Sequence, residues 1–263
     1  MRRTSKSVRL LVERLEDRLT PSDNPALQVP LSSLPGAPAT LYLDFNGHTD
    51  ATWSSFSNID TPPFDTDGNV NTWSATEIQQ ITQIWTFVAE DYAPFNINVS
   101  TVLPPSFAQK VAQRVAIGGT GSWFGSGILG VALLDSFNSG ANPTATCFDF
   151  SANHTTNLVQ NIAFTASHES GHAFGLLHQS DYGPSGNLIA EYGVGLPDGT
   201  SPLMGGNDVP TRNMWWYGHN NVSVTTFQDD VAVISNATNG FGYRADEVLA
   251  LLTRLDAASV RAE

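Results

Sequence analysis

Hydrophobic and polar residues alternate along several short stretches of the chain, which is the pattern of half-buried β-strands. In LYLDF (41–45), the side chains of Leu41, Leu43 and Phe45 share one face. The turn-rich stretch that follows, which contains DTDGN (65–69), predicts a loop. The other predicted strands are NINVSTV (96–102), VAI (115–117), ILGVALL (128–134) and TCFDF (146–150).

The period changes to that of an amphipathic α-helix near Ser74. Ser74 and Glu77 have the spacing of a capping box, in which a hydroxyl and a carboxylate satisfy free N–H groups of the first turn. Pro94 is expected to end this helix. The apolar stripe expected on its buried face consists of Ile78, Ile81, Trp85, Val88 and Tyr92.

Three further helices are expected toward the C-terminus. The second spans about 157–175, and the last, an amphipathic one, covers about 244–257. The third begins near Thr226, where Thr226 and Asp229 again have capping-box spacing, and ends near residue 236. Residues 179–222 are rich in Gly, Pro, Asn and Asp, and so long an irregular stretch within a compact domain is usually functional. Strands and helices in this mixed order predict an α/β chain of the α+β type with a mixed sheet.

The chain is expected to divide into four segments. Residues 1–20 have apolar positions at helical spacing, and LVERLEDRLTPS resembles a tag found ahead of extracytoplasmic or surface proteins in one group of bacteria. This segment is therefore interpreted as an export or processing element, and the protein is expected to be extracytoplasmic or secreted. Residues 21–39 are rich in Pro and Ser and predict an extended linker. The folded body follows over 40–247, and 248–263 form a helical tail.

Charge and composition narrow the possible functions. The formal net charge is −13, and so acidic a chain repels phosphate backbones, which makes nucleic acid an unexpected partner. No apolar run is long enough to span a bilayer, so no transmembrane segment is expected. The single cysteine, Cys147, can form neither an internal disulfide nor a multi-thiolate zinc site, and it is interpreted as a buried residue of a strand. Nothing in the composition decides the oligomeric state.

The candidate chemistry lies in the second predicted helix. His168 and His172 are four residues apart, so both imidazoles lie on one helix face and can bind one divalent cation. Glu169 is placed beside such a metal, where its carboxylate can take a proton from an activated water. Gly175 can adopt a left-handed conformation and turn the chain, which would bring His178 to the same metal as a third ligand.

The complete pattern, HExxHxxGxxH, resembles that of the metzincin zinc endopeptidases. The resemblance implies a methionine turn below the metal, and SPLMG (201–205) supplies Met204. LYLDFNGH, AEDYAPFNINVST and QDDVAVI are further segments that resemble a bacterial, reprolysin- or matrixin-like branch of these peptidases. By this likeness 40–247 is a metallopeptidase catalytic domain. Its upper subdomain would hold a mixed, twisted sheet and two long helices. A small irregular lower subdomain with a C-terminal helix would follow Gly175, with the substrate cleft between the two.

The chain departs from the metzincin pattern at two places. Many relatives carry a Tyr two residues after the turn methionine, but this chain has Gly206. A phenol that stabilises the oxyanion would have to come from Tyr217 or Tyr192. Many relatives also have Asp directly after the third His, whereas here Asp181 is three residues further on; it is a candidate for orienting a ligand His.

The expected function is zinc-dependent endopeptidase activity on protein or peptide substrates, with one catalytic Zn²⁺ held by the three histidines and Glu169 as general base and acid. One alternative is a gluzincin-like site in which Glu191, 19 residues after His172, is the third ligand. Another is a zinc-stabilised binding or adhesion module at the cell surface without turnover. A structural Ca²⁺ at DTDGN (65–69) also stays open, although a plain turn is favoured because Gly68 does not match the EF-hand template.

Overall fold

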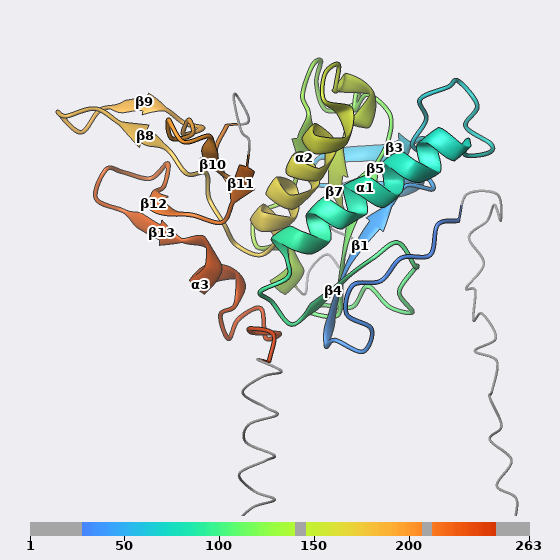
Figure 1. Cartoon of the computed structure of the whole chain (residues 1–263), viewed down its shortest axis with the longest axis horizontal. Helices are drawn as coiled ribbons and strands as arrows, with labels where there is room; N and C mark the ends of the chain where they lie inside the picture. Colours follow the sequence, from blue (N-terminus) through green and yellow to red (C-terminus); the bar gives the residue numbers. More distant parts are fainter. Residues whose placement is uncertain (1–27, 140–145, 207–211, 246–263) are drawn as a thin grey trace, which may run out of the picture.

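The computed structural model describes residues 28–139, 146–206 and 212–245, which form a mixed α/β structure of strands, three α-helices and two short 3₁₀ helices (Figure 1). This confirms the expected α+β class. The expected export segment 1–20 and the helical tail 248–263 lie outside the described residues. The strands are β1 Ala39–Asp44, β2 His48–Trp53, β3 Phe56–Thr61, β4 Ile97–Ser100, β5 Ala112–Ile117, β6 Gly130–Val131, β7 Cys147–Asp149, β8 Asp181–Tyr182, β9 Leu188–Ala190, β10 Thr200–Pro202, β11 Arg212–Met214, β12 Tyr217–His219 and β13 Phe227–Asp229. The helices are α1 Ala75–Asp91, η1 Ser136–Asn138, η2 Ser151–Asn153, α2 Leu158–Ala173 and α3 Asp230–Ile234.

The main sheet has five strands in the order β4-β1-β5-β7-β6. The first four run parallel, whereas β6 pairs antiparallel with β7 at the end of the sheet. The sheet is therefore mixed, as expected. The strand predicted over 128–134 is much shorter in the structure, because only Gly130 and Val131 pair with β7.

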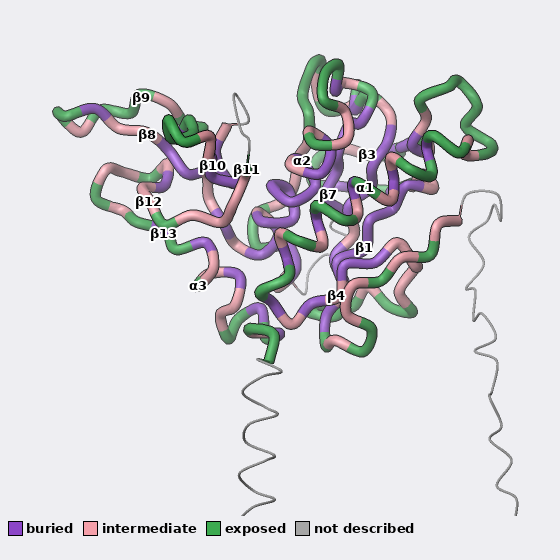
Figure 2. The backbone as a smooth tube through the Cα atoms, viewed as in Figure 1, coloured by how far each residue is buried: buried purple, intermediate pink, exposed green. Residues whose placement is uncertain are grey.

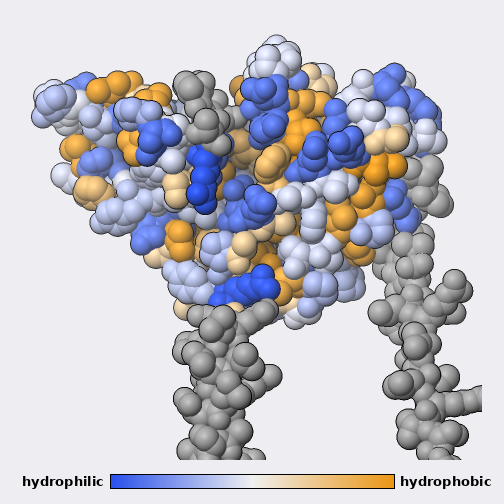
Figure 3. Space-filling model, viewed as in Figure 1, coloured by the Kyte–Doolittle hydropathy of each residue, from blue (hydrophilic) through white to orange (hydrophobic). Residues whose placement is uncertain are grey.

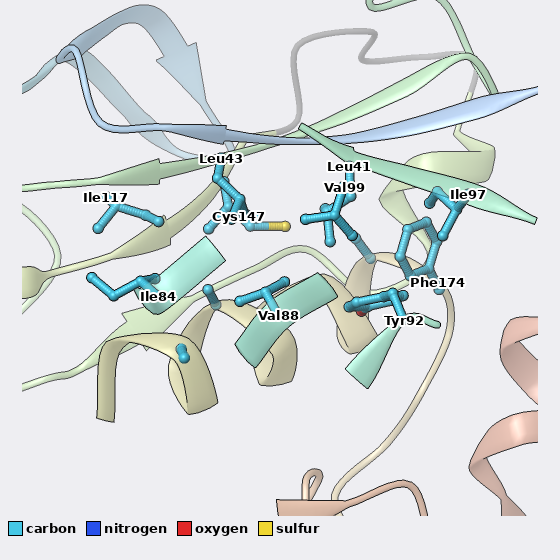
Figure 4. Close-up of a cluster of buried hydrophobic side chains, with 14 of the residues drawn as sticks. Leu41, Leu43, Ile84, Val88, Tyr92, Ile97, Val99, Ile117, Cys147 and Phe174 are labelled. Carbon is cyan, nitrogen blue, oxygen red and sulfur yellow. The ribbon is translucent and has the colours of Figure 1, made fainter. Parts of the chain in front are cut away.

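Helices α1 and α2 lie side by side on one face of the sheet and enclose the main core (Figures 1 and 4). Cys147 lies on β7 within this core and is fully buried, as the sequence predicted. Figure 4 shows side chains of the sheet above those of α1 in one continuous apolar layer. The members of this layer include Leu41, Leu43, Ile84, Val88, Tyr92, Ile97, Val99, Ile117 and Phe174.

The opposite face of the sheet is covered by a hairpin of β2 and β3, which the sequence had predicted to be a loop. Its Trp53 packs against Phe148 of β7 with ring centroids 5.6 Å apart. The tight turn of the hairpin has Ser54 at φ 51, a conformation more usual for Gly or Asn. The prediction was wrong because the turn lacks these residues and the strands alternate only weakly in hydrophobicity.

Helix α1 begins at the predicted capping box, but its buried face is rotated from the predicted stripe. The Ser74 hydroxyl accepts from the Glu77 N–H, and Glu77 Oε2 accepts from the Ser74 N–H at 2.8 Å. Glu77 Oε1 also accepts from the Thr66 N–H at 2.7 Å, which turns this side chain inward. Ile78 is consequently 41% exposed, and Ile84 takes a place on the buried face that the pattern had not assigned to it.

The Pro- and Ser-rich segment is extended, yet its described part is bonded to the sheet region. Ser33 N donates to Val99 O, and the N–H of Val99 donates back to the Ser33 hydroxyl at 2.9 Å. Leu31 O also accepts from the Thr101 N–H at 3.0 Å. From about residue 29 the segment therefore belongs to the body, rather than linking to it at residue 40.

Beyond Gly175 the chain forms paired short strands, β8 with β9, β10 with β11 and β12 with β13, where the sequence had predicted an irregular stretch. Figure 1 places these ribbons and α3 to one side of the α2 helix. The region has a short third helix, but not the capping box expected at Thr226. Residues 227–229 are strand β13, and Asp229 itself caps α3 by accepting from the Ala232 N–H at 3.0 Å. Among the described residues, no helix has the length and apolar character needed to cross a membrane.

Candidate metal centre

Helix α2 and the turn after it bring three histidines together. His168 and His172 lie one turn apart on α2, and their ring centroids are 4.8 Å apart. The helix ends at Ala173 with Phe174 as its C-cap, and Gly175 follows with φ +99, a left-handed conformation that a side chain would strain. The chain thereby turns back, and the His178 ring lies 4.8 Å from that of His172.

Each imidazole is oriented by a hydrogen bond from its Nδ1 atom. The Nδ1–H of His168 donates to Leu203 O at 2.8 Å, and that of His172 donates to Leu176 O at 2.7 Å. These bonds fix the tautomer, so the Nε2 atom of each ring keeps its lone pair free. The Nδ1–H of His178 donates to Glu191 Oε1 at 3.0 Å, the arrangement by which carboxylates orient metal-binding histidines.

The donor set fits a zinc ion. Ligand atoms of the three histidines lie within 4.8 Å of one another, and the Nε2 atoms of His172 and His178 are 3.0 Å apart. Two nitrogens bound tetrahedrally to zinc at about 2.0–2.1 Å would be separated by about 3.3 Å. The three imidazoles could hold Zn²⁺ with one coordination position left for another group.

The local environment favours neutral rings, which is the form that binds metal. Burial lowers the pKa of His168 well below its ordinary value, and the two neighbouring imidazoles lower it further. Burial also lowers the pKa of His172 to about 4. Metal binding at neutral pH would therefore not have to compete with protonation of these two rings.

Glu169 lies on α2 directly after His168, and both residues are buried. Its carboxylate lies against Gly130 of β6, so closely that a Cβ built on Gly130 would stand 2.7 Å from Glu169 Oε1. Burial raises the pKa of Glu169 well above its usual range, and the negative charge of Asp149 raises it further. A carboxyl group with a raised pKa is suited to accept and return a proton. A divalent cation at the neighbouring histidines would favour its ionised form.

Met204 packs against helix α2 at Gly171, which lies between His168 and His172 in the sequence. It is fully buried, and a Cβ built on Gly171 would stand 2.6 Å from its sulfur. The preceding carbonyl, Leu203 O, is the acceptor that orients His168. The carbonyl of Met204 accepts from the Gln179 N–H at 2.8 Å, so the turn contacts the chain on both sides of the site.

The structure brings one of the candidate tyrosines to the site and leaves the other away from it. The ring of Tyr192 lies 4.2 Å from that of His178 and 6.1 Å from that of His168. Tyr217 is 68% exposed on β12, and its ring stacks on Phe227. Tyr217 is therefore a surface residue of the ribbon, and Tyr192 is the phenol beside the histidines.

Two carboxylates have roles that differ from those expected. Asp181 does not orient a histidine: its Oδ2 atom accepts from the Val194 N–H at 2.8 Å and so holds the loop that carries Tyr192. Glu191 contacts His178 through Nδ1, the nitrogen opposite the one that faces His172. This geometry makes Glu191 a partner of the third histidine rather than a third ligand in its place.

Besides the histidines, a cluster of three acidic residues lies around the DTDGN turn (65–69). Ligand atoms of Asp65, Asp67 and Glu77 come within 4.8 Å of one another. The Asp65 Oδ1 atom accepts three backbone N–H groups of its own turn, and both oxygens of Glu77 accept from the capping residues and Thr66. The hydrogen bonds account for the cluster as a turn and a helix cap, and structural calcium stays a prediction.

A buried hydrogen-bonded hub beside His178 was not foreseen from the sequence. Asp230 Oδ1 accepts from Gln179 Nε2 at 2.8 Å and from Gln228 Nε2 at 2.9 Å. Gln228 in turn bonds both the N–H and the carbonyl of Leu177. The hub thus fixes the residues on either side of His178. The glutamine directly after the third histidine was the only hint of it in the sequence.

Comparisons of this chain with known protein families and with curated proteins found no match.

Proposed function

We propose that the protein is a zinc-dependent endopeptidase. The observation that carries the proposal is the combination of three imidazoles with free Nε2 atoms and a buried carboxylate, Glu169, on the same helix as two of them. Within the described residues the histidine group has three members, whereas a structural zinc site closes its fourth position with protein. A base beside an open position is the arrangement of hydrolytic sites.

The sheet supports a peptide as substrate rather than another amide. Among the described strands, β6 is the last in the sheet order and pairs only with β7. An edge strand of this kind offers free backbone N–H and C=O groups to an extended peptide. Because Gly130 of β6 touches Glu169, a peptide bound along this edge would pass beside the base.

Each residue of the site has a definite task in peptide hydrolysis. His168, His172 and His178 would hold zinc, which when bound acts as a Lewis acid and lowers the pKa of water. Glu169 accepts the proton of the water whose oxygen attacks the scissile carbonyl carbon. The same carboxyl group then returns this proton to the nitrogen as the C–N bond breaks, so the products are a free acid and a free amine.

Glu169→Gln is the variant that tests the proposal. It keeps the size of the side chain but removes the base, so we expect it to bind one zinc per chain while cleavage of unfolded casein falls by about 10²–10⁴-fold. Glu90→Gln, the same chemical change at an exposed position of α1, is the matched control and should leave cleavage unchanged. Zinc is measured by elemental analysis, and removal of zinc by a chelator should stop cleavage by the wild-type chain.

Two outcomes would contradict the proposal in different ways. A Glu169→Gln protein as active as the wild type would show that this carboxyl group is not the base. A wild-type chain that binds one zinc but cleaves no unfolded protein or peptide would instead favour a zinc-stabilised binding module.

A further inference from the structure

The inner face of the β2–β3 hairpin changes from apolar to polar toward the open end of the hairpin. Ile59 of β3 belongs to the same buried cluster as Phe148 of β7, so its side chain faces the sheet. Asp50 is paired directly opposite Ile59, and His48 is paired opposite Thr61. Residues paired across two strands point to the same side, and so do residues two apart along one strand. His48, Asp50 and Thr61 therefore share the face that the hairpin turns to the sheet.

These three residues are enclosed by protein and present polar atoms without partners. The exposed fraction is 5% for the side chain of Asp50 and 17% for that of His48, and Thr61 is 4% exposed. Among the described residues, Asp50 Oδ2, His48 Nε2 and Thr61 Oγ1 are buried atoms that form no hydrogen bond. Burying one such polar atom is unfavourable unless it has a partner, so three of them at one place indicate a site for a polar ligand.

His48 and Asp50 lie close together without being hydrogen bonded. The Nε2 atom of His48 is 3.1 Å from Oδ1 of Asp50, but the two groups are not aligned as donor and acceptor. The buried pair of His154 and Asp149 gives a comparison within the same chain, since its atoms are 3.0 Å apart and do form a hydrogen bond. Two atoms bound to one metal ion at about 2.1 Å lie about 3.0–3.4 Å apart. The spacing of His48 and Asp50 is therefore that of two ligands of one ion.

The charge and the donor types of this group favour a cation. Within the described ranges Asp50 is paired with no arginine or lysine, whereas Asp44 at the end of β1 is paired with Arg114. A buried carboxylate is stable when it is paired with a full positive charge or coordinates a metal. An imidazole nitrogen together with a carboxylate oxygen suits Zn²⁺, and the Thr61 hydroxyl adds a neutral oxygen. A divalent ion therefore satisfies the three atoms and the charge of Asp50 together.

We propose that His48 and Asp50 bind a Zn²⁺ ion inside the β2–β3 hairpin, with the Thr61 hydroxyl as a third donor. The hairpin covers the face of the sheet opposite to α2, so this site is separate from the three histidines and does not depend on the proposed peptidase function. The apolar cluster of Trp53 and Ile59 holds the rest of the hairpin, and the ion joins β2 to β3 at the open end. Because the site has one imidazole, it binds zinc more weakly than the three histidines do, and gel filtration should remove the ion.

Calorimetric titration of the gel-filtered chain with zinc chloride tests the site. The wild type should take up one zinc ion that His48→Gln and Asp50→Asn bind at least tenfold more weakly. Removing a ligand costs no less than removing a group that only orients a ligand, which is about 10–100-fold in affinity. His219→Gln is the matched control and should bind this ion as the wild type does. Its Nδ1 atom is also buried without a partner, but in the described part of the chain no carboxylate is paired with it.

Hydrogen exchange locates the ion without any substitution. An ion that binds only the closed hairpin lowers the population of the opened form, so zinc should slow exchange at the backbone amides of β2 and β3 in the wild type. With free zinc at 100 times the Kd of this site, we expect the slowing to be about 100-fold. Zinc at the three histidines would instead protect α2 and the turn after it, so the two regions report on separate ions. In Asp50→Asn the hairpin should gain no protection.

Three results would overturn the proposal. If the wild type and His48→Gln bound the same number of zinc ions with the same affinities, the three polar atoms would enclose water rather than a metal. If Asp50→Asn kept the additional ion at full affinity, the carboxylate would not be a ligand. If zinc left exchange in β2 and β3 of the wild type unchanged, the ion would not lie in the hairpin, and this result holds even where a variant fails to fold.

Discussion

The residues before and after Gly175 are held together in different ways. The bulkiest fully buried side chains of the described residues, among them Phe45, Phe148 and Phe174, all precede Gly175. After Gly175 the buried side chains are mostly polar. In Figure 2 purple predominates in strands β1, β5 and β7 and along much of α2, whereas the ribbons show more pink and green. The polar buried residues of the second part are Gln179, Ser180, Ser201, Asn220, Gln228, Asp230 and Asn239.

The difference matters because the histidine site draws on both parts. Apolar burial is strong and non-directional, so it stabilises the sheet and presents His168 and Glu169 on a rigid helix. Hydrogen bonds contribute less energy but fix direction, and they position His178 and the loop of Tyr192. In the second part some hydrophobic residues stay at the surface instead of in a core: over the β8–β9 ribbon, Ile189 is 66% exposed (Figure 3). We infer that the residues before Gly175 supply most of the stability of the fold. The residues after Gly175 orient the side chains that they contribute to the histidine site.

Leu43→Ala should have the largest effect on stability. Leu43 is fully buried on β1, the strand that pairs with both β4 and β5, so its truncation leaves a cavity in the centre of the core. We expect the free energy of unfolding to fall by about 2–5 kcal/mol, measured by urea denaturation.

Leu196→Ala removes the same atoms from the ribbon part and is the matched control. Leu196 is 50% exposed, so its loss should change the free energy of unfolding by less than about 0.5 kcal/mol. Equal losses for the two variants would mean that apolar burial supports both parts alike, contrary to the comparison.

Asp230→Ala should disturb the site while sparing the sheet. It leaves the buried amides of Gln179 and Gln228 without their shared acceptor, at a cost of about 1–3 kcal/mol. Because Gln228 holds Leu177, next to His178, zinc affinity should fall by about tenfold or more. Hydrogen exchange should quicken at residues 177–181 and stay slow in β1 and β5.

Asp198→Ala makes the same chemical change on the surface of the ribbon part. Within the described ranges, the Asp198 carboxylate bonds only Thr200, so zinc affinity and hydrogen exchange should match those of the wild type. If Asp230→Ala also made hydrogen exchange faster at the backbone amides of β1 and β5, the two parts would unfold as one unit. The hydrogen bonds of Asp230 would then not act on the site alone.

The same contrast explains which elements could be predicted from the sequence. Helix α1 and the strands around Leu41 and Val99 were predicted because an apolar core imposes a regular period on the residues that face it. The ribbons after Gly175 were not predicted, since strands of only two or three residues are too short to show a period. The exposure of Ile78 was also missed, because the inward turn of Glu77 depends on a bond to Thr66 in the loop before the helix.

The candidate site divides along the same line. The three histidines and Glu169 follow from helical spacing and one turn-forming glycine, both of which are local properties of the sequence. Glu191 and Tyr192 lie more than a dozen residues beyond His178, and their approach depends on how the ribbons fold back. The sequence offered both Tyr192 and Tyr217 as candidates, but it could not show which of the two lies beside the histidines.

Asp91 lies where the two parts meet, and its replacement should have the smallest effect of the three. Its carboxylate accepts from the Ser167 hydroxyl at 2.7 Å, and its carbonyl accepts from the Trp215 indole N–H at 2.6 Å. Burial raises the pKa of Asp91 to about 7, so the folded protein binds this proton more tightly than the unfolded chain does. The ionised carboxylate therefore costs stability, and the cost grows as pH rises from about 4 to about 7.

Asp91→Asn removes that cost and keeps an oxygen for the Ser167 hydroxyl. The whole shift would correspond to about 4 kcal/mol, and we expect about 1–2 kcal/mol because Asp91 is partly exposed. The variant should therefore be more stable than the wild type at pH 8 and no more stable at pH 3.5, where both chains carry a neutral group. Urea denaturation at the two pH values measures the difference. Equal gains at both pH values would show that the change acts through packing rather than through the charge of the carboxylate.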